Sequence, residues 1–252
     1  MVKGIDIFKE AMRDYTDQFI IIGGTACDYI MENIGLNFRA TQDLDIVLII
    51  EAINNDFFKE FWEFIKKGKY QNLQKSTGKK QFYRFYGPLN KSYPKMIELF
   101  SRELESILLP EESRFTPIHT DEKLSSLSAI LLNDDYYKFI INNRIKLDDL
   151  PFVTAECLIP LKAKAWMDLS IRKNNGEMID SKNIKKHKLD IIRLSQVLSA
   201  EHTISLPPSI KKDMLKFMTK YEKSVIDPKS INIKMKPEVV FQRLRYYYQL
   251  DK

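Results

Sequence analysis

Hydrophobic residues form two short, dense runs near the start of the chain. The first run, 19–22, is apolar and mainly β-branched, and 46–50 is a second run of the same kind. Runs of this length are too short for helices and are typical of buried strands. Apolar residues between positions 1 and 16 follow a helical spacing instead. The pattern therefore predicts an amphipathic helix followed by two core strands.

Aromatic and aliphatic residues after Asn54 recur among lysines and glutamates at helical spacing, which predicts a helix that ends near Gly68. Segments 81–86 and 96–100 read as two strands of a hairpin around a Gly-Pro turn. We interpret 125–132 and 136–141 as another hairpin, and 144–147 as a further strand. The region up to residue 150 is thus expected to be built around a sheet.

From Thr154 onward the pattern is helical. Thr154 is expected to cap a helix that ends at Asn174-Asn175-Gly176, and three more helices are predicted over 184–199, from Pro207-Pro208 to 221, and over 238–250. The change near Leu150-Pro151 predicts two domains, 1–150 and 151–252. The expected fold class is α+β: an N-terminal domain with a mixed sheet and flanking helices, followed by a mainly helical C-terminal domain.

The composition is that of a globular protein, with 44% hydrophobic and 29% charged residues in 252. Cys27 and Cys157 are the only cysteines, which argues against a disulfide scaffold or a zinc site. The apolar runs are too short to cross a bilayer and the charged N-terminus does not resemble a signal peptide. We therefore expect a reduced, cytoplasmic location and no membrane partner.

Charge is unevenly distributed. The formal net charge is +6 with a pI of about 9.0, yet residues 151–252 carry +9 and residues 1–150 carry −3. A basic second part beside an acidic first part suits an anionic substrate held next to a metal ion. The alternative is a solvated, lysine-rich surface.

Gly23-Gly24-Thr25 follows the first apolar run directly. Two glycines allow a tight turn and a close approach to a ligand, and Thr25 stands where the cap of the next helix is expected. A strand, a glycine turn and a helix N-terminus together present N–H groups and a positive dipole end to an anion. This order is typical of a phosphate cradle.

Asp43-Leu44-Asp45 leads into the second apolar run. Residues two apart on a strand point to the same side, so the two carboxylates face one way and Leu44 faces the core. Paired carboxylates make a divalent cation their natural partner. Glu98 is a further acid within an otherwise apolar strand, either a third metal ligand or an edge-strand surface residue.

The glycine turn followed by the D-x-D strand resembles the nucleotidyltransferase superfamily with the polymerase-β-like palm. The resemblance is closest to the branch of AbiEii-type toxins of bacterial toxin–antitoxin pairs, where an arginine and a threonine precede the acids, as Arg39 and Thr41 do here. It implies an NTP substrate and one or two Mg²⁺ ions held by Asp43, Asp45 and Glu98. It also implies nucleotide contacts from the residues of the glycine turn and from Arg39 and Thr41.

Two lysines and a basic cluster in the helical part extend this reading. Lys162 and Lys164 are two apart and so occupy different helix faces. The resemblance favours Lys162 as the side chain that stabilises charge on the leaving pyrophosphate, and a surface lysine is the alternative. It likewise implies nucleotide or phosphate contacts for Lys186, His187 and Asp190, which by spacing alone also fit an exposed helix with an internal ion pair.

Together these features predict transfer of NMP from an NTP to an acceptor hydroxyl. An RNA or tRNA end, a protein side chain and a small molecule all stay open as acceptors. The branch resemblance implies a toxin-like role and a cognate antitoxin protein. The alternative function is a catalytically silent nucleotide- or nucleic-acid-binding module with the same fold.

Overall fold

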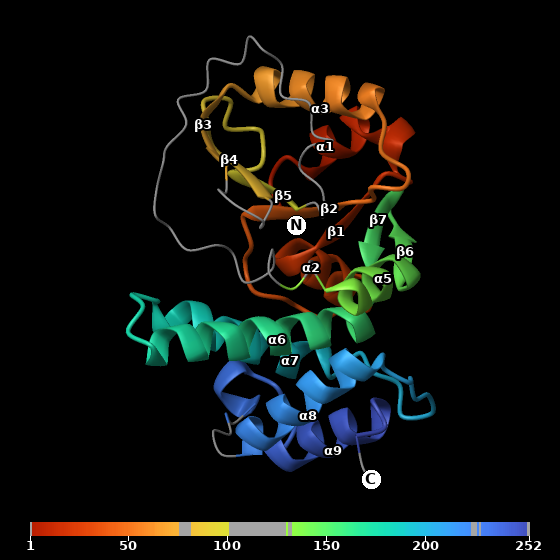
Figure 1. The fold of residues 1–252 in the computed structure, drawn as a ribbon, viewed down its shortest axis with the longest axis vertical. Coiled ribbons are helices and arrows are strands. Elements are labelled where there is room, and N and C mark those ends of the chain that lie inside the picture. Colours follow the sequence, from red (N-terminus) through yellow and green to blue (C-terminus); the bar gives the residue numbers. More distant parts are fainter. Residues whose placement is uncertain are drawn as a thin grey trace. The chain divides into compact units, whose positions relative to one another are not determined.

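The computed structural model describes residues 2–75, 82–100, 130, 133–222, 226 and 228–250. The chain folds into two compact units, Met1–Leu132 with Arg144–Val153, and Asn133–Asn143 with Thr154–Lys252. Figure 1 shows the elements of both. Each unit is described by itself below.

A seven-stranded sheet forms the first unit, in the order β3-β4-β5-β2-β1-β7-β6. The sheet is mixed: β2 pairs in parallel with β5 and β1 with β7, whereas the other neighbours are antiparallel. The expected α+β class with a mixed sheet is therefore confirmed. The strands are β1 (Phe19–Ile22), β2 (Asp43–Leu48), β3 (Tyr70–Lys75), β4 (Phe82–Pro88), β5 (Met96–Phe100), β6 (Arg144–Leu147) and β7 (Leu150–Val153).

Helices cover both faces of this sheet. In Figure 1, α1 (Ile5–Ala11) and α3 (Asn55–Gly68) lie on one face and α2 (Gly23–Asn33) on the other. A short 3₁₀ turn, η1 (Arg13–Tyr15), follows α1, so the first helix is shorter than expected. Phe8 packs edge-on against Phe19 and Phe64, with ring centres 5.5 and 5.4 Å apart. This aromatic core joins the first helix, the first strand and α3.

The helix after Asn54 is confirmed. The Asn54 side chain accepts a hydrogen bond from Phe57 N, and Lys69 ends the helix in the left-handed conformation. The hairpin of β4 and β5 and the strand at 144–147 are also as predicted. Strands β3 and β7 were not expected. β7 begins at Leu150, where a domain change was predicted, and instead pairs with β1 in the middle of the sheet.

Helices make up the second unit, with α6 packed against α7 and α8. Pro160 lies inside α6 and cannot donate to the carbonyl of Glu156, four residues before it. The Tyr248 hydroxyl donates to that carbonyl at 2.9 Å, so the chain end compensates for the proline. The elements are α5 (Asp134–Asn142), α6 (Ala155–Asn174), α7 (Ser181–Leu194), α8 (Pro208–Glu222), the 3₁₀ turn η2 (Pro228–Ile231) and α9 (Pro237–Tyr247).

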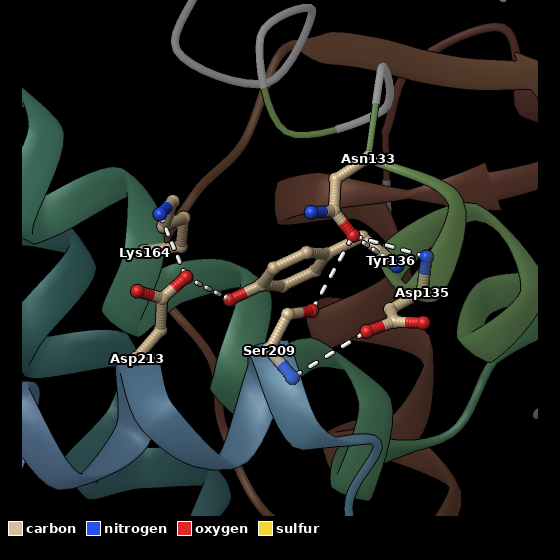
Figure 2. Close-up of polar contacts among 6 residues, drawn as sticks. All are labelled: Asn133, Asp135, Tyr136, Lys164, Ser209 and Asp213. Atoms are coloured by element: carbon tan, nitrogen blue, oxygen red, sulfur yellow. Dashed lines mark hydrogen bonds and ion pairs between the residues drawn. The ribbon is translucent and has the colours of Figure 1, made fainter.

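The strand predicted at 136–141 is wrong, because this segment is helix α5. Asn133 caps it by accepting hydrogen bonds from the backbone N–H groups of Asp135 and Tyr136. Tyr136 then donates to Asp213 on α8, and Asp135 accepts from the Ser209 N–H (Figure 2). Asn133 lies between the two predicted strands, where the hairpin prediction requires a turn. Segment 125–132, its supposed partner strand, lies outside the described residues apart from Ile130.

No helix among the described residues has both the length and the apolar character needed to span a membrane.

Candidate functional site

The glycine turn lies directly against the acidic strand. β1 ends at Ile22, and α2 begins at Gly23, whose φ of +71° is in the left-handed region. A Cβ at Gly23 would lie 1.8 Å from Asp45 Oδ2, and one at Gly24 would lie 2.6 Å from Thr41 Oγ1. A side chain at either position would have to displace the Asp45 or Thr41 side chain, and at Gly23 it would also strain the backbone. Arg39 is also close, with Nη2 3.6 Å from the Cβ position of Gly24.

Thr25 does not cap α2, contrary to the sequence prediction. The helix begins two residues earlier, and Thr25 is fully buried in its first turn. Its hydroxyl donates to the backbone carbonyl of Asp43 at 2.7 Å. Thr25 therefore ties the start of α2 to the start of the strand that carries both aspartates.

Three acids point to the same side of the sheet. Leu44 is fully buried, whereas Asp43 and Asp45, on the other side of the strand, are half-buried. Asp45 is in register with Glu98 on β5. Residues in register on neighbouring strands project from the same face, so Glu98 shares a face with Asp43 and Asp45.

Arg84 forms an ion pair with Glu98 that no sequence pattern predicted. The two are in register on antiparallel strands, and Arg84 Nε donates to Glu98 Oε1 at 2.5 Å. Glu98 is 8% exposed, so this pairing compensates a nearly buried charge. The alternation of segment 81–86 places Arg84 on one strand face, but only the hairpin register identifies Glu98 as its partner.

The arrangement of the carboxylates fits a cation held with help from a substrate. Within the described part of the chain, no group of three or more His, Cys, Asp or Glu side chains is arranged to hold a metal ion. Mg²⁺ is usually bound by one or two carboxylates together with substrate phosphates. Asp43 and Asp45 match that donor set, with Asp45 against the glycine turn.

A cavity of about 1000 Å³ opens beside Asp43 in the same unit. Its wall combines basic, aromatic and apolar side chains. Of the lining residues, Thr41 and Asp43 are the ones that the sequence predicted as site residues. The lining consists of Lys3, Ala40, Thr41, Gln42, Asp43, Arg84, Tyr86, Gly87, Pro88, Lys91, Tyr93, Lys95 and Met96.

The site residues predicted in the helical part belong to the second unit. Lys162 and Asp190 form a buried ion pair, with Lys162 Nζ donating to Asp190 Oδ2 at 3.0 Å. Arg193 Nη1 lies 3.5 Å from the other carboxylate oxygen. Lys186 and His187 lie half-buried on α7, one turn before Asp190. Asp190 thus joins α6 to α7 through Lys162 and also faces Arg193 within α7.

Lys164 lies on a different side of α6 from Lys162, as predicted. Its Nζ donates to Asp213 Oδ2 at 2.6 Å, the same oxygen that accepts from the Tyr136 hydroxyl (Figure 2). This contact ties α6 to α8 and α5. Lys164 is therefore part of the packing of the second unit.

Lys188 is a buried amine that no sequence pattern marked. It is 2% exposed, and its Nζ lies 4.6 Å from the ring centre of Tyr221 and 5.2 Å from that of Trp166. Burial lowers the pKa of Lys188 to about 8. Attraction to the two ring faces offsets part of the cost of burying the ammonium.

No protein-family model matches the sequence, and no curated protein matches it either. The structure is similar to that of an antigenic nucleotidyltransferase-like protein from Paracoccidioides brasiliensis, with a TM-score of 0.43 and 13% identity, over 96% of this chain and 99% of that one. It is also similar to the Megavirus polyadenylate synthase, with a TM-score of 0.40 and 11% identity, over 87% of this chain and 36% of that one. Identities this low, with TM-scores under 0.5, say nothing about the activity of this chain.

Proposed function

We propose that this protein transfers NMP from an NTP to an acceptor hydroxyl with the help of a divalent cation. The observation that carries the proposal is the contact between the glycine turn and Asp45, since a Cβ at Gly23 would lie 1.8 Å from Asp45 Oδ2. A helix N-terminus that favours phosphate thus adjoins a carboxylate that favours a cation. An NTP complexed with Mg²⁺ presents both kinds of group at once.

Each candidate site residue of the first unit has a distinct role in this proposal. The backbone N–H groups at Gly23 and Gly24 bind the outer phosphates at the N-terminus of α2. Asp43 and Asp45 hold the cation, and Thr25 fixes the backbone of Asp43 by its 2.7 Å hydrogen bond. A bound Mg²⁺ supplies Lewis-acid stabilisation of phosphate charge and lowers the pKa of the attacking hydroxyl. Arg39 and Thr41, beside Gly24, contact the nucleotide.

Glu98 is proposed as the third acid, nearest the attacking hydroxyl. Its Oε1 accepts a hydrogen bond from Arg84 Nε at 2.5 Å, which compensates its charge in a nearly buried position. In this proposal a cation or the attacking hydroxyl competes with Arg84 for the Glu98 carboxylate. Arg84 thereby controls when the third carboxylate is available.

For the helical unit, the resemblance supports a proposal of phosphate contacts from Lys186 and His187. Lys186 and His187 present basic groups on the half-buried face of α7. The charge of Lys162 is already compensated by Asp190, so its contribution is smaller than the sequence suggested. Asp190 is proposed to position Lys162, not to contact the nucleotide directly, because it is fully buried.

Labelled NTPs provide the direct test. The purified chain is incubated with each α-³²P-labelled NTP, Mg²⁺ and total cellular RNA or protein, and label in each fraction is counted. We expect label in one acceptor class, lost in Asp45→Asn while the melting temperature stays within a few degrees of the wild type. Asp56→Asn, on the exposed surface of α3, is the matched control and keeps activity. Transfer that survives Asp45→Asn contradicts the proposal.

Binding without transfer is a second candidate function, favoured by the Arg84–Glu98 pair that keeps one acid neutralised. Calorimetric titration with each NTP, with and without Mg²⁺, separates the two. Affinity that is independent of the metal and unchanged in Asp45→Asn, with no label transfer, supports the binding module.

A toxin-like role with a cognate antitoxin is proposed from the sequence resemblance, with RNA as the acceptor that fits it. Induced expression in a bacterial host is expected to stop growth, and Asp45→Asn is expected to restore it. Normal growth with an actively transferring enzyme would remove the toxin role and leave the chemistry in place.

A further inference from the structure

We propose that the cavity beside Asp43 is the acceptor site, and that the acceptor carries phosphate groups. This inference rests on the proposed nucleotidyl transfer, and it names the class of acceptor that the sequence left open. The charge, position and shape of the cavity each support it.

The position of the cavity suits an attacking group. In the sheet, β1 and its glycine turn lie on one side of β2, and β5 and β4 lie on the other. Besides Lys3 and residues 40–43, the cavity is lined from β4, β5 and the segment between them, including Tyr86, Lys91 and Met96. The strands that line the cavity therefore lie across β2 from the proposed phosphate cradle, and Thr41 borders both the cavity and Gly24. In-line transfer needs the attacking and leaving oxygens on opposite sides of the phosphorus.

The charge of the cavity favours an anion. The cationic lining side chains are Lys3, Lys91, Lys95 and Arg84, of which Arg84 is paired with Glu98, whereas Asp43 is the acid among the described lining residues. Lys91 donates to the Pro88 carbonyl and Lys95 to Gln42 Oε1, each at 2.9 Å. Both acceptors are neutral, so these bonds aim the ammonium groups without cancelling their charge. Phosphate oxygens bind such groups through charge-assisted hydrogen bonds, whereas a cationic acceptor is repelled.

The remaining wall is suited to the organic part of such an acceptor. Tyr86, Pro88 and Met96 offer an aromatic ring and apolar surface within the same cavity. A volume of about 1000 Å³ is at the upper end for small-ligand sites, so it accepts more than one phosphate-bearing unit. A nucleotide, free or at the end of a nucleic acid, combines phosphate with a flat ring that stacks on aromatic side chains.

Binding without NTP or Mg²⁺ tests the site independently of the chemistry. The probes are a fluorescent six-nucleotide single-stranded RNA with a 5′-phosphate, followed by anisotropy, and AMP as a competitor. We expect the double variant K91Q/K95Q to bind the RNA at least tenfold more weakly and with a shallower salt dependence. The double variant K59Q/K66Q removes two lysines from the exposed face of α3 and is expected to bind as the wild type does. Displacement by AMP identifies a single phosphorylated nucleotide as sufficient, and displacement only by RNA identifies a polynucleotide.

Kinetics then separate failure of this inference from failure of the proposed function. In the label-transfer assay, K91Q/K95Q is expected to raise KM for the acceptor at least tenfold while KM for the NTP stays within twofold. Transfer with unchanged acceptor KM in this variant overturns the acceptor site and leaves the proposed function intact. RNA binding that depends on Lys91 and Lys95 without any transfer by the wild type supports a phosphate site and overturns the proposed function. Equal RNA binding by both double variants overturns the cavity assignment.

Discussion

Arg84 Nε lies 2.5 Å from Glu98 Oε1, on adjacent antiparallel strands in the sheet that also carries Asp43 and Asp45. Glu98 therefore faces two like charges on one side and a guanidinium on the other. Carboxylates that share a site raise one another's free energy, and the arginine offsets that repulsion in the absence of a cation. The pair explains how three acids are accommodated on one sheet face.

Breaking the Arg84–Glu98 pair is expected to destabilise the fold. Arg84→Leu leaves the nearly buried Glu98 without its guanidinium and should lower the free energy of unfolding by about 1–3 kcal/mol. The double variant R84L/E98L should recover most of that loss because no charge is stranded. Urea unfolding of the wild type, Arg84→Leu, Glu98→Leu and the double variant gives the coupling energy between the two side chains. Additive losses would show that the two side chains do not stabilise each other.

Gly23→Ala is expected to abolish label transfer and to destabilise the protein by about 2–4 kcal/mol, from left-handed backbone strain and the clash with Asp45. Gly35→Ala is the matched control, because its φ of +72° is nearly the same and no atom lies within 4 Å of the added Cβ. The control should cost only about 1–2 kcal/mol and keep activity. Thermal melts and the label assay compare them. Equal effects at both glycines would remove the special role of the Gly23–Asp45 contact.

Asp190→Asn is expected to cost about 3–5 kcal/mol of unfolding free energy, since it strands Lys162, only 7% exposed, and weakens the hold on Arg193. Lys162→Met should cost less, because Arg193 still faces the carboxylate. Lys59→Met removes the exposed pair with Asp56 and should leave the stability unchanged. Denaturant titration of the three variants checks this order. A larger loss for Lys162→Met than for Asp190→Asn would contradict the pairing.

Lys188 makes stability depend on pH in a defined direction. Its folded pKa of about 8 is below the ordinary value of 10.5, so the unfolded chain binds more protons between these pH values. The contribution of Lys188 to stability therefore rises with pH across that window. Lys188→Met, which removes the buried charge, should be more stable than the wild type by about 1–3 kcal/mol at pH 7, with the gap closing towards pH 10.5. Urea unfolding of both proteins from pH 6.5 to 10 measures the gap. A stability difference that is constant with pH would show that burial does not lower the pKa of Lys188.

The sequence by itself determined the features that depend on neighbours along the chain. The β-branched run at 19–22 and the alternation of Asp43, Leu44 and Asp45 specify strands and the faces of their side chains. Gly23, directly after that run, permits the left-handed backbone conformation that other residue types rarely adopt. Asn54 specifies a helix start by its own side chain. Each of these is local, so periodicity and residue type were sufficient to predict it.

Only the tertiary structure decided which elements meet. The hairpin prediction placed a turn at Asn133, because helix caps and turns use the same residue types. Helix α5 is held in place by Asp213 and Ser209, more than 70 positions away. Arg84 meets Glu98 through the hairpin register, and Lys162 meets Asp190 through the packing of α6 on α7. A residue pattern specifies which face of an element is buried, but not which charged residue of another element that face contacts. The partner follows from the free energy of packing the whole unit.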